Sequence, residues 1–210
     1  MLPWFEYGRF TISLFAILSP FSALPTFLLL TERSSEAEKL RVATVATVTV
    51  AIVLTAAAIA GQAILAVLDT SLAAFQVAGG VVLMLLAFAM LKAEPSSVQP
   101  HPASAVRPAR TASIGIIPLG LPLLAGPGSI SAVIIEMNRS AALGHTAMVI
   151  GCILIVCASN WLVLRLSKPI SYRLGPSGVD IMTRFFGLIV IAIAIQFIAT
   201  GLRALFPGLG

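Results

Sequence analysis

Long runs of apolar residues fill most of the chain, and the charged residues lie in the segments between them. Six runs contain no charged residue at all: 10–31, 42–68, 72–91, 112–135, 146–164 and 185–202. A helix needs roughly 20 apolar residues to cross the hydrocarbon core of a membrane, and each run is about that long. The runs are continuously apolar, whereas the strands of an outer-membrane barrel alternate apolar with polar positions. The pattern therefore predicts an all-α membrane protein with six transmembrane helices.

The composition agrees with this pattern and leaves no room for a soluble domain. Of the 210 residues, 59% are hydrophobic and 10% are charged, and the mean hydropathy is +1.04. A soluble domain of this size could not bury so much apolar surface. We therefore expect residues 1–210 to form a single integral membrane domain. The start, MLPWFEYGRF, has no basic cluster and no small-residue cleavage site follows it, so we expect the first span to be retained.

The basic residues are divided unequally between the two sides of the predicted bundle. Three lie on the side of both termini: Arg9, Arg139 and Arg203. Ten lie on the opposite side: Arg33, Lys39, Arg41, Lys92, Arg107, Arg110, Arg165, Lys168, Arg173 and Arg184. Because basic residues favour the cytoplasmic side, we expect both termini in the periplasm of a bacterial inner membrane and a cytoplasmic loop at 92–112. This topology accounts for the net charge of +5 without nucleic acid as a partner.

Two of the apolar runs contain residues that interrupt helices. The fourth run has Pro118, Pro122 and the string LLAGPGSI (123–130), and the first has SPFSALP (19–25). Proline lacks a backbone donor and glycine weakens a helix, and lipid cannot satisfy the backbone groups that a break sets free. Such breaks are tolerated where protein or water meets those groups, although proline kinks can also serve packing alone. We expect residues 19–25 and 125–129 to be non-helical or sharply bent and to approach each other near the membrane midplane.

The two breaks occupy equivalent positions in the two halves of the chain. Pro127 follows Pro20 by 107 residues, and Gly187 follows Gly79 by 108 residues. Three spans per half insert the second half with the opposite orientation, which is the inverted-repeat architecture of many secondary transporters. We therefore expect two inverted three-helix repeats with helices one and four broken. The repeats cover about residues 5–91 and 113–206.

The half-helices at each break present groups of opposite charge. A helix N-terminus is partly positive and a C-terminus partly negative, so two facing breaks could hold a zwitterion without any charged side chain. Ser22 and Ser129 each follow a break proline by two residues. Their hydroxyls could complete the coordination of either end of a zwitterion, or could bond their own helix backbone. Larger polar side chains within the runs are expected to face the bundle interior: Gln62, Gln76, Asn160 and Gln196.

Four strings in order along the chain resemble the MarC family of bacterial inner-membrane proteins, also called the neutral amino acid transporter family. PLGLPLLAGPGSI (118–130) resembles the family signature PLAxPLLAGPGAI. LFAILSPFSALPTFLLLT (14–31) resembles LFxxxNPIGxxPxFLxLT, and FQVAGGVVL (75–83) resembles FxIAGGxLL. The closing string RFFGL from Arg184, with the later Gln196 and Gly201, resembles the pattern R-x-x-G-L…Q…G.

The resemblance implies six transmembrane helices, a place near the lysine-exporter superfamily, and the export of small neutral amino acids such as alanine or glycine. The chain departs from the family at Ser19, where Asn is usual, and at Ser22, where Gly is usual. Serine keeps a hydroxyl but lacks the reach of an amide, so the substrate can differ. The breaks and the family strings together give the expected substrate-binding residues: Ser19, Pro20, Ser22, Pro25, Gln76, Gly79, Gly80, Ala125, Gly126, Pro127, Gly128, Ser129 and Gln196.

No feature of the sequence indicates an enzyme. It contains no nucleophile–base pair, phosphate-binding loop or metal-binding motif, so we expect no catalytic residue, no metal and no cofactor. We expect a secondary transporter for a small molecule, with H+ or Na+ as a possible coupling ion. Sodium at the break carbonyls, protons at Glu6 or Asp69, and facilitated diffusion are all compatible with the sequence. The alternative is a structural or regulatory membrane protein that transports nothing.

Overall fold

The computed structural model describes residues 3–31, 34–67, 69–92, 126–140 and 142–206. These residues form helices and turns without a strand, which confirms the predicted all-α class for the described part of the chain. The helices are α1 (Trp4–Leu18), α2 (Pro20–Leu30), α3 (Glu36–Val67), α4 (Leu72–Lys92), α6 (Pro127–Met137), α7 (Leu143–Arg165) and α8 (Ser167–Leu205).

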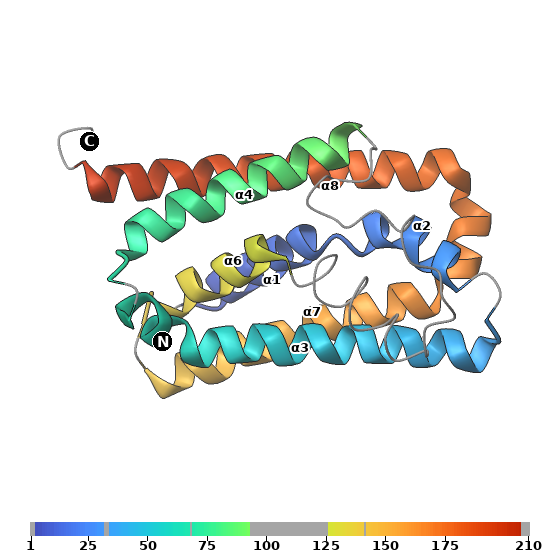
Figure 1. Cartoon of the computed structure of the whole chain (residues 1–210), viewed down its shortest axis with the longest axis horizontal. Helices are drawn as coiled ribbons and strands as arrows, with labels where there is room; N and C mark the ends of the chain where they lie inside the picture. Colours follow the sequence, from blue (N-terminus) through green and yellow to red (C-terminus); the bar gives the residue numbers. More distant parts are fainter. Residues whose placement is uncertain (1–2, 32–33, 68, 93–125, 141, 207–210) are drawn as a thin grey trace.

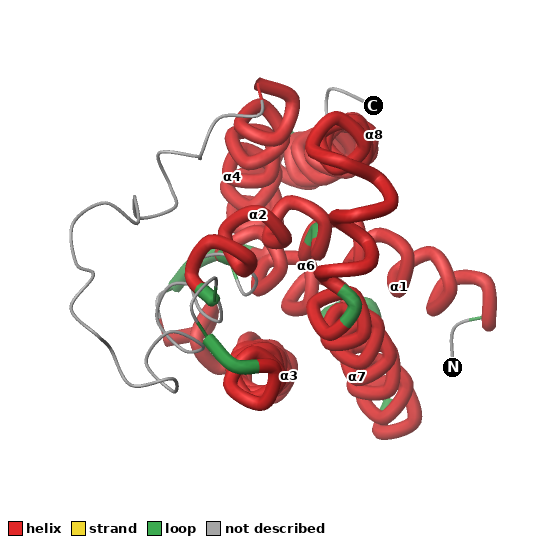
Figure 2. Tube along the Cα trace, turned by 90° about the vertical axis from the view of Figure 1, so that its right-hand side faces the viewer, coloured by secondary structure: helices red, strands yellow, loops and turns green. Residues whose placement is uncertain are grey.

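The helices form three layers, with the short helices between two antiparallel pairs (Figure 1). One pair is α4 packed along α8, and the other is α3 packed along α7. The middle layer contains α1, α2 and α6, and the end-on view in Figure 2 places α2 and α6 between the pairs. Within this layer α1 and α6 run in opposite directions (Figure 1). The start of α1 and the end of α8, the described ends of the chain, lie at the same end of the bundle (Figure 1).

Four helical segments are long and apolar enough to cross a membrane: Glu36–Val67, Leu72–Lys92, Leu143–Arg165 and Ser177–Leu205. They correspond to the second, third, fifth and sixth predicted spans. The first predicted span is divided into α1 and α2, of 15 and 11 residues. Of the fourth, the structure describes the shorter apolar helix α6, and residues 112–125 lie outside the described part. The loop expected at 92–112 also lies outside it, apart from Lys92 at the end of α4.

Local sequence determines where two of the long helices begin and bend. α3 begins with a capping box, in which Ser35 Oγ accepts a hydrogen bond from Glu38 N–H (3.3 Å) and Glu38 Oε2 accepts one from Ser35 N–H (2.8 Å). These bonds satisfy backbone donors that the first turn would leave free. α8 bends at Gly175, whose φ of 64° lies in the left-handed region that glycine tolerates. The bend separates residues 167–174 from the membrane-crossing part of α8.

Glycine residues let α4 and α8 pack backbone against backbone. A Cβ atom at Gly80 would lie 2.8 Å from the carbonyl oxygen of Ala194, and one at Gly201 would lie 2.7 Å from that of Ala73. Both distances are too short for a side chain, so each position requires glycine. Lipid is as apolar as the helices, so membrane helices associate mainly through such close contact of small residues.

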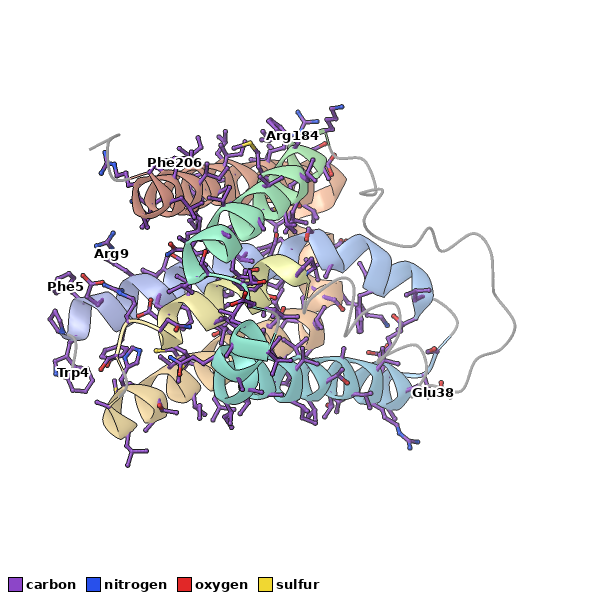
Figure 3. The ribbon with its side chains drawn as sticks, turned by 60° about the vertical axis from the view of Figure 1, so that its left-hand side comes forward. Trp4, Phe5, Arg9, Glu38, Arg184 and Phe206 are labelled. Atoms are coloured by element: carbon purple, nitrogen blue, oxygen red, sulfur yellow. The ribbon has the colours of Figure 1, made fainter. Side chains whose placement is uncertain are left out.

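The two ends of the bundle differ in their number of basic residues, and six labelled residues mark these ends (Figure 3). Trp4, Phe5, Arg9 and Phe206 lie toward one end, and Glu38 and Arg184 toward the other. Aromatic rings at an end suit a membrane–water interface. Among the described residues, the end with both termini carries three basic residues: Arg9, Arg139 and Arg203. The opposite end carries the others: Lys39, Arg41, Lys92, Arg165, Lys168, Arg173 and Arg184.

Candidate functional site

The first predicted span breaks at a single residue, Ser19, in the interior of the bundle. Ser19 has φ 41° and ψ 69°, which is the left-handed conformation, and its N–H donates to the carbonyl of Phe15 (3.0 Å). Pro20 begins α2 and has no N–H, so the carbonyl of Ala16 cannot receive its usual helical hydrogen bond. The left-handed region costs a non-glycine residue roughly 1–2 kcal/mol. The break therefore leaves strain at Ser19 and deprives the Ala16 carbonyl of its usual helical donor.

The second predicted break coincides with the start of α6. Gly126 is extended (φ −67°, ψ 165°) and Pro127 is the first helical residue, a position where its missing N–H causes no loss. Ala125 and the residues that precede it lie outside the described part of the chain. The expectation that 19–25 and 125–129 would be non-helical or sharply bent is met at Ser19 and Gly126 but not along the rest of the described residues of these segments. Residues 20–25 belong to α2 and residues 127–129 to α6, because proline disturbs mainly the turn that precedes it.

Ser22 and Ser129 make the same hydrogen bonds at the two breaks. The hydroxyl and the N–H of Ser22 both donate to the carbonyl of Ser19, at 2.8 and 3.0 Å. The hydroxyl and the N–H of Ser129 both donate to the carbonyl of Gly126, at 2.8 and 3.1 Å. Each hydroxyl therefore bonds its own backbone and keeps only its acceptor lone pairs for a ligand.

Glycines bring the start of α6 against α1 and α4. A Cβ atom at Gly128 would lie 2.4 Å from Leu83 Cδ2 of α4 and 3.9 Å from Ile17 Cγ2 of α1. A Cβ atom at Gly79 would lie 2.7 Å from the Cβ of Ser131 in α6. Ile17 is two residues before the first break, and Gly128 is two residues after the second. The packing therefore brings the two breaks close together, and Gly79 serves that close packing.

The remaining expected site residues lie away from the breaks, or their side chains lie outside the described part of the structure. Gly80 packs against α8. Gln76 is half-buried on α4, and its Cβ would lie 3.1 Å from a Cβ atom added at Gly201 of α8. Gln196 is exposed on α8 and its Nε2 donates to Thr200 Oγ1 (3.3 Å). The backbone of Pro25 belongs to α2, and its side chain lies outside the described atoms.

The polar side chains of the apolar runs are placed only partly as expected. Asn160 is fully buried, in agreement with the expectation of an interior position. The expectation is wrong for Gln62 and Gln196, which are exposed. Gln62 Nε2 donates to Asn138 Oδ1 (3.0 Å), so its amide is satisfied by the turn after α6 and does not need the interior.

Three buried side chains lack hydrogen-bond partners within the described residues. Ser19, Thr47 and Asn160 have exposed fractions of 2%, 7% and 0%. Their unpartnered atoms are Ser19 Oγ, Thr47 Oγ1 and both Nδ2 and Oδ1 of Asn160. Buried polar atoms are almost always bonded, so this group calls for an explanation. Thr47 was not among the expected residues, because one threonine in an apolar helix resembles any other in sequence.

A second polar group lies at the end of the bundle where α1 begins, and its buried members are hydrogen-bonded. His145 is buried between α1 and α6, with Nδ1 3.0 Å from the Tyr7 hydroxyl and Nε2 2.9 Å from the Glu136 carbonyl. A carbonyl only accepts, so Nε2 carries a proton, and in the neutral ring Nδ1 accepts from Tyr7. Arg139 pairs with Glu6 (2.8 Å) and Glu136 (3.2 Å). We call these five residues the polar clasp.

The polar clasp joins three helices through ionised and neutral groups. Glu6 and Tyr7 come from α1, Glu136 from α6 and His145 from α7, with Arg139 in the turn after α6. Partial burial lowers the pKa of Arg139, but its hydrogen bond to Glu6 and the charge of Glu136 raise that pKa more, to above its usual value. Sequence alone indicated no partner for His145, because Tyr7 lies 138 residues away.

Comparisons with known proteins agree with the strings singled out in the sequence. The chain matches the MarC family integral membrane proteins over residues 4–206. It is 30% identical over 203 residues to the UPF0056 membrane protein YhcE of Escherichia coli strain K12, an alignment covering 97% of this chain and 94% of that protein. It is 36% identical to a UPF0056 membrane protein of Methanocaldococcus jannaschii, over 91% of this chain and 93% of the relative.

A relative from Bacillus subtilis strain 168, the UPF0056 membrane protein YvbG, is 35% identical over 93% of both chains. No solved structure matches the chain. The family match includes all seven described helices and both breaks. Together with the apolar helices that cross the bundle from end to end, it shows that this chain belongs to the MarC family of integral membrane proteins.

Proposed function

We propose that this protein is a secondary transporter that exports small neutral amino acids, or metabolites of similar size and charge, across the bacterial inner membrane. The observation that carries the proposal is the pair of helix ends in the bundle interior. α1 ends at Leu18, α2 begins at Pro20, and α6 begins at Pro127 in contact with the last turn of α1. Lipid cannot satisfy such ends, and transporters use them to bind polar cargo.

The chemistry of the break region favours a cargo without net charge. The residues around the breaks, 14–24 and 126–132, include no charged side chain. The C-terminal end of α1 carries partial negative charge and suits an ammonium group, and the N-terminal ends of α2 and α6 suit a carboxylate. A zwitterionic amino acid offers both groups at a separation of a few ångströms, so its charges can be balanced without an ionised side chain.

An inverted repeat is also part of the proposal, and the helix contacts support it. In that arrangement α1–α2 corresponds to the fourth span, α3 to α7, and α4 to α8. The main contacts follow this correspondence: α1 and α2 touch α7 and α8, and α6 touches α3 and α4, besides smaller contacts of α6 with α1 and α7. The opposite directions of α1 and α6 fit the same relation (Figure 1). Repeats of this kind rock against each other to expose a central site to either side.

The proposed orientation places the end with the termini in the periplasm. Seven of the ten described basic residues lie at the other end, which the positive-inside rule assigns to the cytoplasm. A cysteine introduced at position Ser97, in the expected cytoplasmic loop, should resist a membrane-impermeant thiol reagent in intact cells with a permeabilised outer membrane. A cysteine at position Trp4 should react, and the opposite labelling pattern would contradict the orientation.

The test of transport uses purified protein in liposomes loaded with labelled alanine. We expect efflux that depends on the protein, saturates with alanine, and is reduced by unlabelled glycine. Imposing a proton or a sodium gradient in separate experiments identifies the coupling ion, or shows facilitated diffusion if neither matters. Folded protein that moves none of a panel of neutral solutes would contradict the proposal and favour a structural or regulatory role.

A further inference from the structure

The three unpartnered side chains lie in one shared core between α1–α2, α3 and α7. Thr47 lies between Ala46 and Val50 on the buried face of α3, and Asn160 continues the buried face of α7 that includes Val156 and Cys157. Ser19 lies between core residues of α1 and α2. The neighbouring members of one core cluster are Leu18, Ala23, Leu24, Ala46, Val50, Val156 and Cys157.

Observed contacts between helices show that Thr47 and Asn160 lie at similar depth. Trp161 Nε1 donates to Thr44 Oγ1 (3.0 Å), which fixes the antiparallel helices α7 and α3 relative to each other. Asn160 precedes Trp161 by one residue, and Thr47 follows Thr44 by three. Because the two helices are antiparallel, both steps lead toward the same end of the bundle. At a rise of 1.5 Å per residue, Asn160 lies about 1.5 Å and Thr47 about 4.5 Å from the Trp161–Thr44 contact. The two side chains therefore differ in depth by about 3 Å.

Ser19 lies on the other side of Asn160 in depth, about 6 Å from Asn160 and about 9 Å from Thr47. Cys152 Sγ donates to the carbonyl of Tyr7 (3.8 Å), which fixes α7 relative to α1, and these two helices run in the same direction (Figure 1). Asn160 lies about 12 Å beyond Cys152, and Ser19 lies about 18 Å beyond Tyr7, by the helical rise. Asn160 is thus within about one helical turn of the break between α1 and α2.

We propose that Ser19, Thr47 and Asn160 form the polar wall of the cargo site and bind the ammonium and carboxylate groups of a zwitterionic ligand. This inference rests on the proposed transport function and names the residues and ligand class of its site. Asn160 offers an acceptor and two donors, and each hydroxyl offers one donor and two acceptors. These groups can therefore bond both ends of a zwitterion, whereas a bare cation would leave Asn160 Nδ2 unpaired.

The neighbouring helix ends give the ligand its direction. The carbonyl of Ala16 and the C-terminal end of α1 attract the ammonium group, together with Asn160 Oδ1. The N-terminal end of α2 attracts the carboxylate, together with Asn160 Nδ2 and a hydroxyl. Thr47 and Asn160 belong to α3 and α7, so the site lies between the broken helix and one antiparallel pair.

The experiment measures equilibrium binding of labelled alanine to purified protein, with transport and thermal unfolding measured in parallel. Asn160→Leu and Thr47→Val keep the shape of each side chain and remove its polar atoms. We expect affinity to fall at least tenfold in each, because a hydrogen bond to a charged group is lost. Thr47→Ser keeps the hydroxyl and should bind nearly as wild type. Lactate and ethylamine, which each lack one charged group of alanine, should compete poorly.

Matched controls use polar groups that already have partners. Thr49→Val removes a hydroxyl that donates to the carbonyl of Val45 (2.8 Å), and Gln62→Leu removes an exposed amide on the same helix. Both controls should keep wild-type affinity. Wild-type transport with unchanged affinity in Asn160→Leu and Thr47→Val would overturn the polar wall and leave the transport proposal standing. Wild-type protein that neither binds nor moves any zwitterion would overturn both, and the three groups would then hold water only.

Discussion

The polar clasp and the polar wall both include buried residues of the α1–α2 segment and of α7, but their hydrogen bonding is opposite. In the clasp, His145 is bonded at both ring nitrogens and Arg139 pairs with two carboxylates. In the wall, the amide atoms of Asn160 and the hydroxyls of Ser19 and Thr47 have no hydrogen-bond partner among the described residues. The clasp is ionised and lies at the end with the termini, whereas the wall is neutral and lies at the break.

The difference separates residues that stabilise the fold from residues that are free to bind. Bonded polar groups in a low-dielectric interior strengthen one another and fix the position of their helices. A buried polar group without a hydrogen-bond partner lowers the stability of the folded protein by about 1–3 kcal/mol. Such a group can be retained where a bound ligand supplies the missing partner. The protein therefore fixes α1, α6 and α7 at one end and leaves polar groups unbonded in its interior.

The largest expected effect on stability is the loss of the central residue of the clasp. His145→Ala removes a fully buried ring and leaves the Tyr7 hydroxyl and the Glu136 carbonyl without that partner. We expect the free energy of unfolding to fall by about 3–5 kcal/mol, measured by denaturant titration in detergent micelles. Asn160→Leu, at an equally buried position of the same helix, should leave stability unchanged or increase it. Equal losses in the two variants would show that both groups are structural.

A smaller loss is expected when the ion pairs of the clasp are broken. Arg139→Met leaves the buried carboxylate of Glu136 without its cation, but the Arg139 side chain is 40% exposed and solvent screens the charges. We expect a loss of about 1–2 kcal/mol in the same titration. Adding Glu136→Gln should recover part of this loss. Arg203→Met, at the same end, is the control and should change stability little; a matching loss there would contradict specific pairing.

The smallest expected effect concerns the backbone of the break. Ser19→Gly relieves the left-handed strain but adds freedom to the unfolded chain, so the net gain in stability is about 0.5–1 kcal/mol. Ser19→Ala keeps the strain and should gain less. Both variants lose the hydroxyl and should therefore weaken alanine binding to a similar degree. A stability gain in Ser19→Ala as large as in Ser19→Gly would show that the hydroxyl, and not the backbone, carries the cost.

The sequence predicts the long helices well because one physical property determines them. An uninterrupted apolar run must be helical to satisfy its backbone in lipid, and α3, α4, α7 and α8 follow from this rule. It also predicts the first break from Pro20, since proline removes a helical donor. The break is confined to Ser19, and Pro25 lies inside α2. This exact location depends on how the surrounding helices pack against the chain.

The sequence predicts the polar contacts poorly because they depend on packing between distant segments. Nothing local distinguishes Thr47 from Thr49, yet one hydroxyl is unpartnered and the other bonds its own helix. The outward position of Gln62 depends on Asn138, which lies 76 residues away. The pairing of His145 with Tyr7 likewise requires that α7 be placed beside α1.

The bend of α8 at Gly175 limits how the two outer helix pairs can move. Residues 167–174 connect α7 to the rest of α8 at one end, where Lys168 forms an ion pair with Glu36 of α3. At the other end, five peptide units from Val67 to Leu72 can extend to at most about 18 Å. The chain therefore links the two pairs at both ends of the bundle and limits how far they can separate. Any movement that opens the interior must therefore keep α7 joined to α8 at one end and α3 joined to α4 at the other, with α1–α2 and α6 between the pairs.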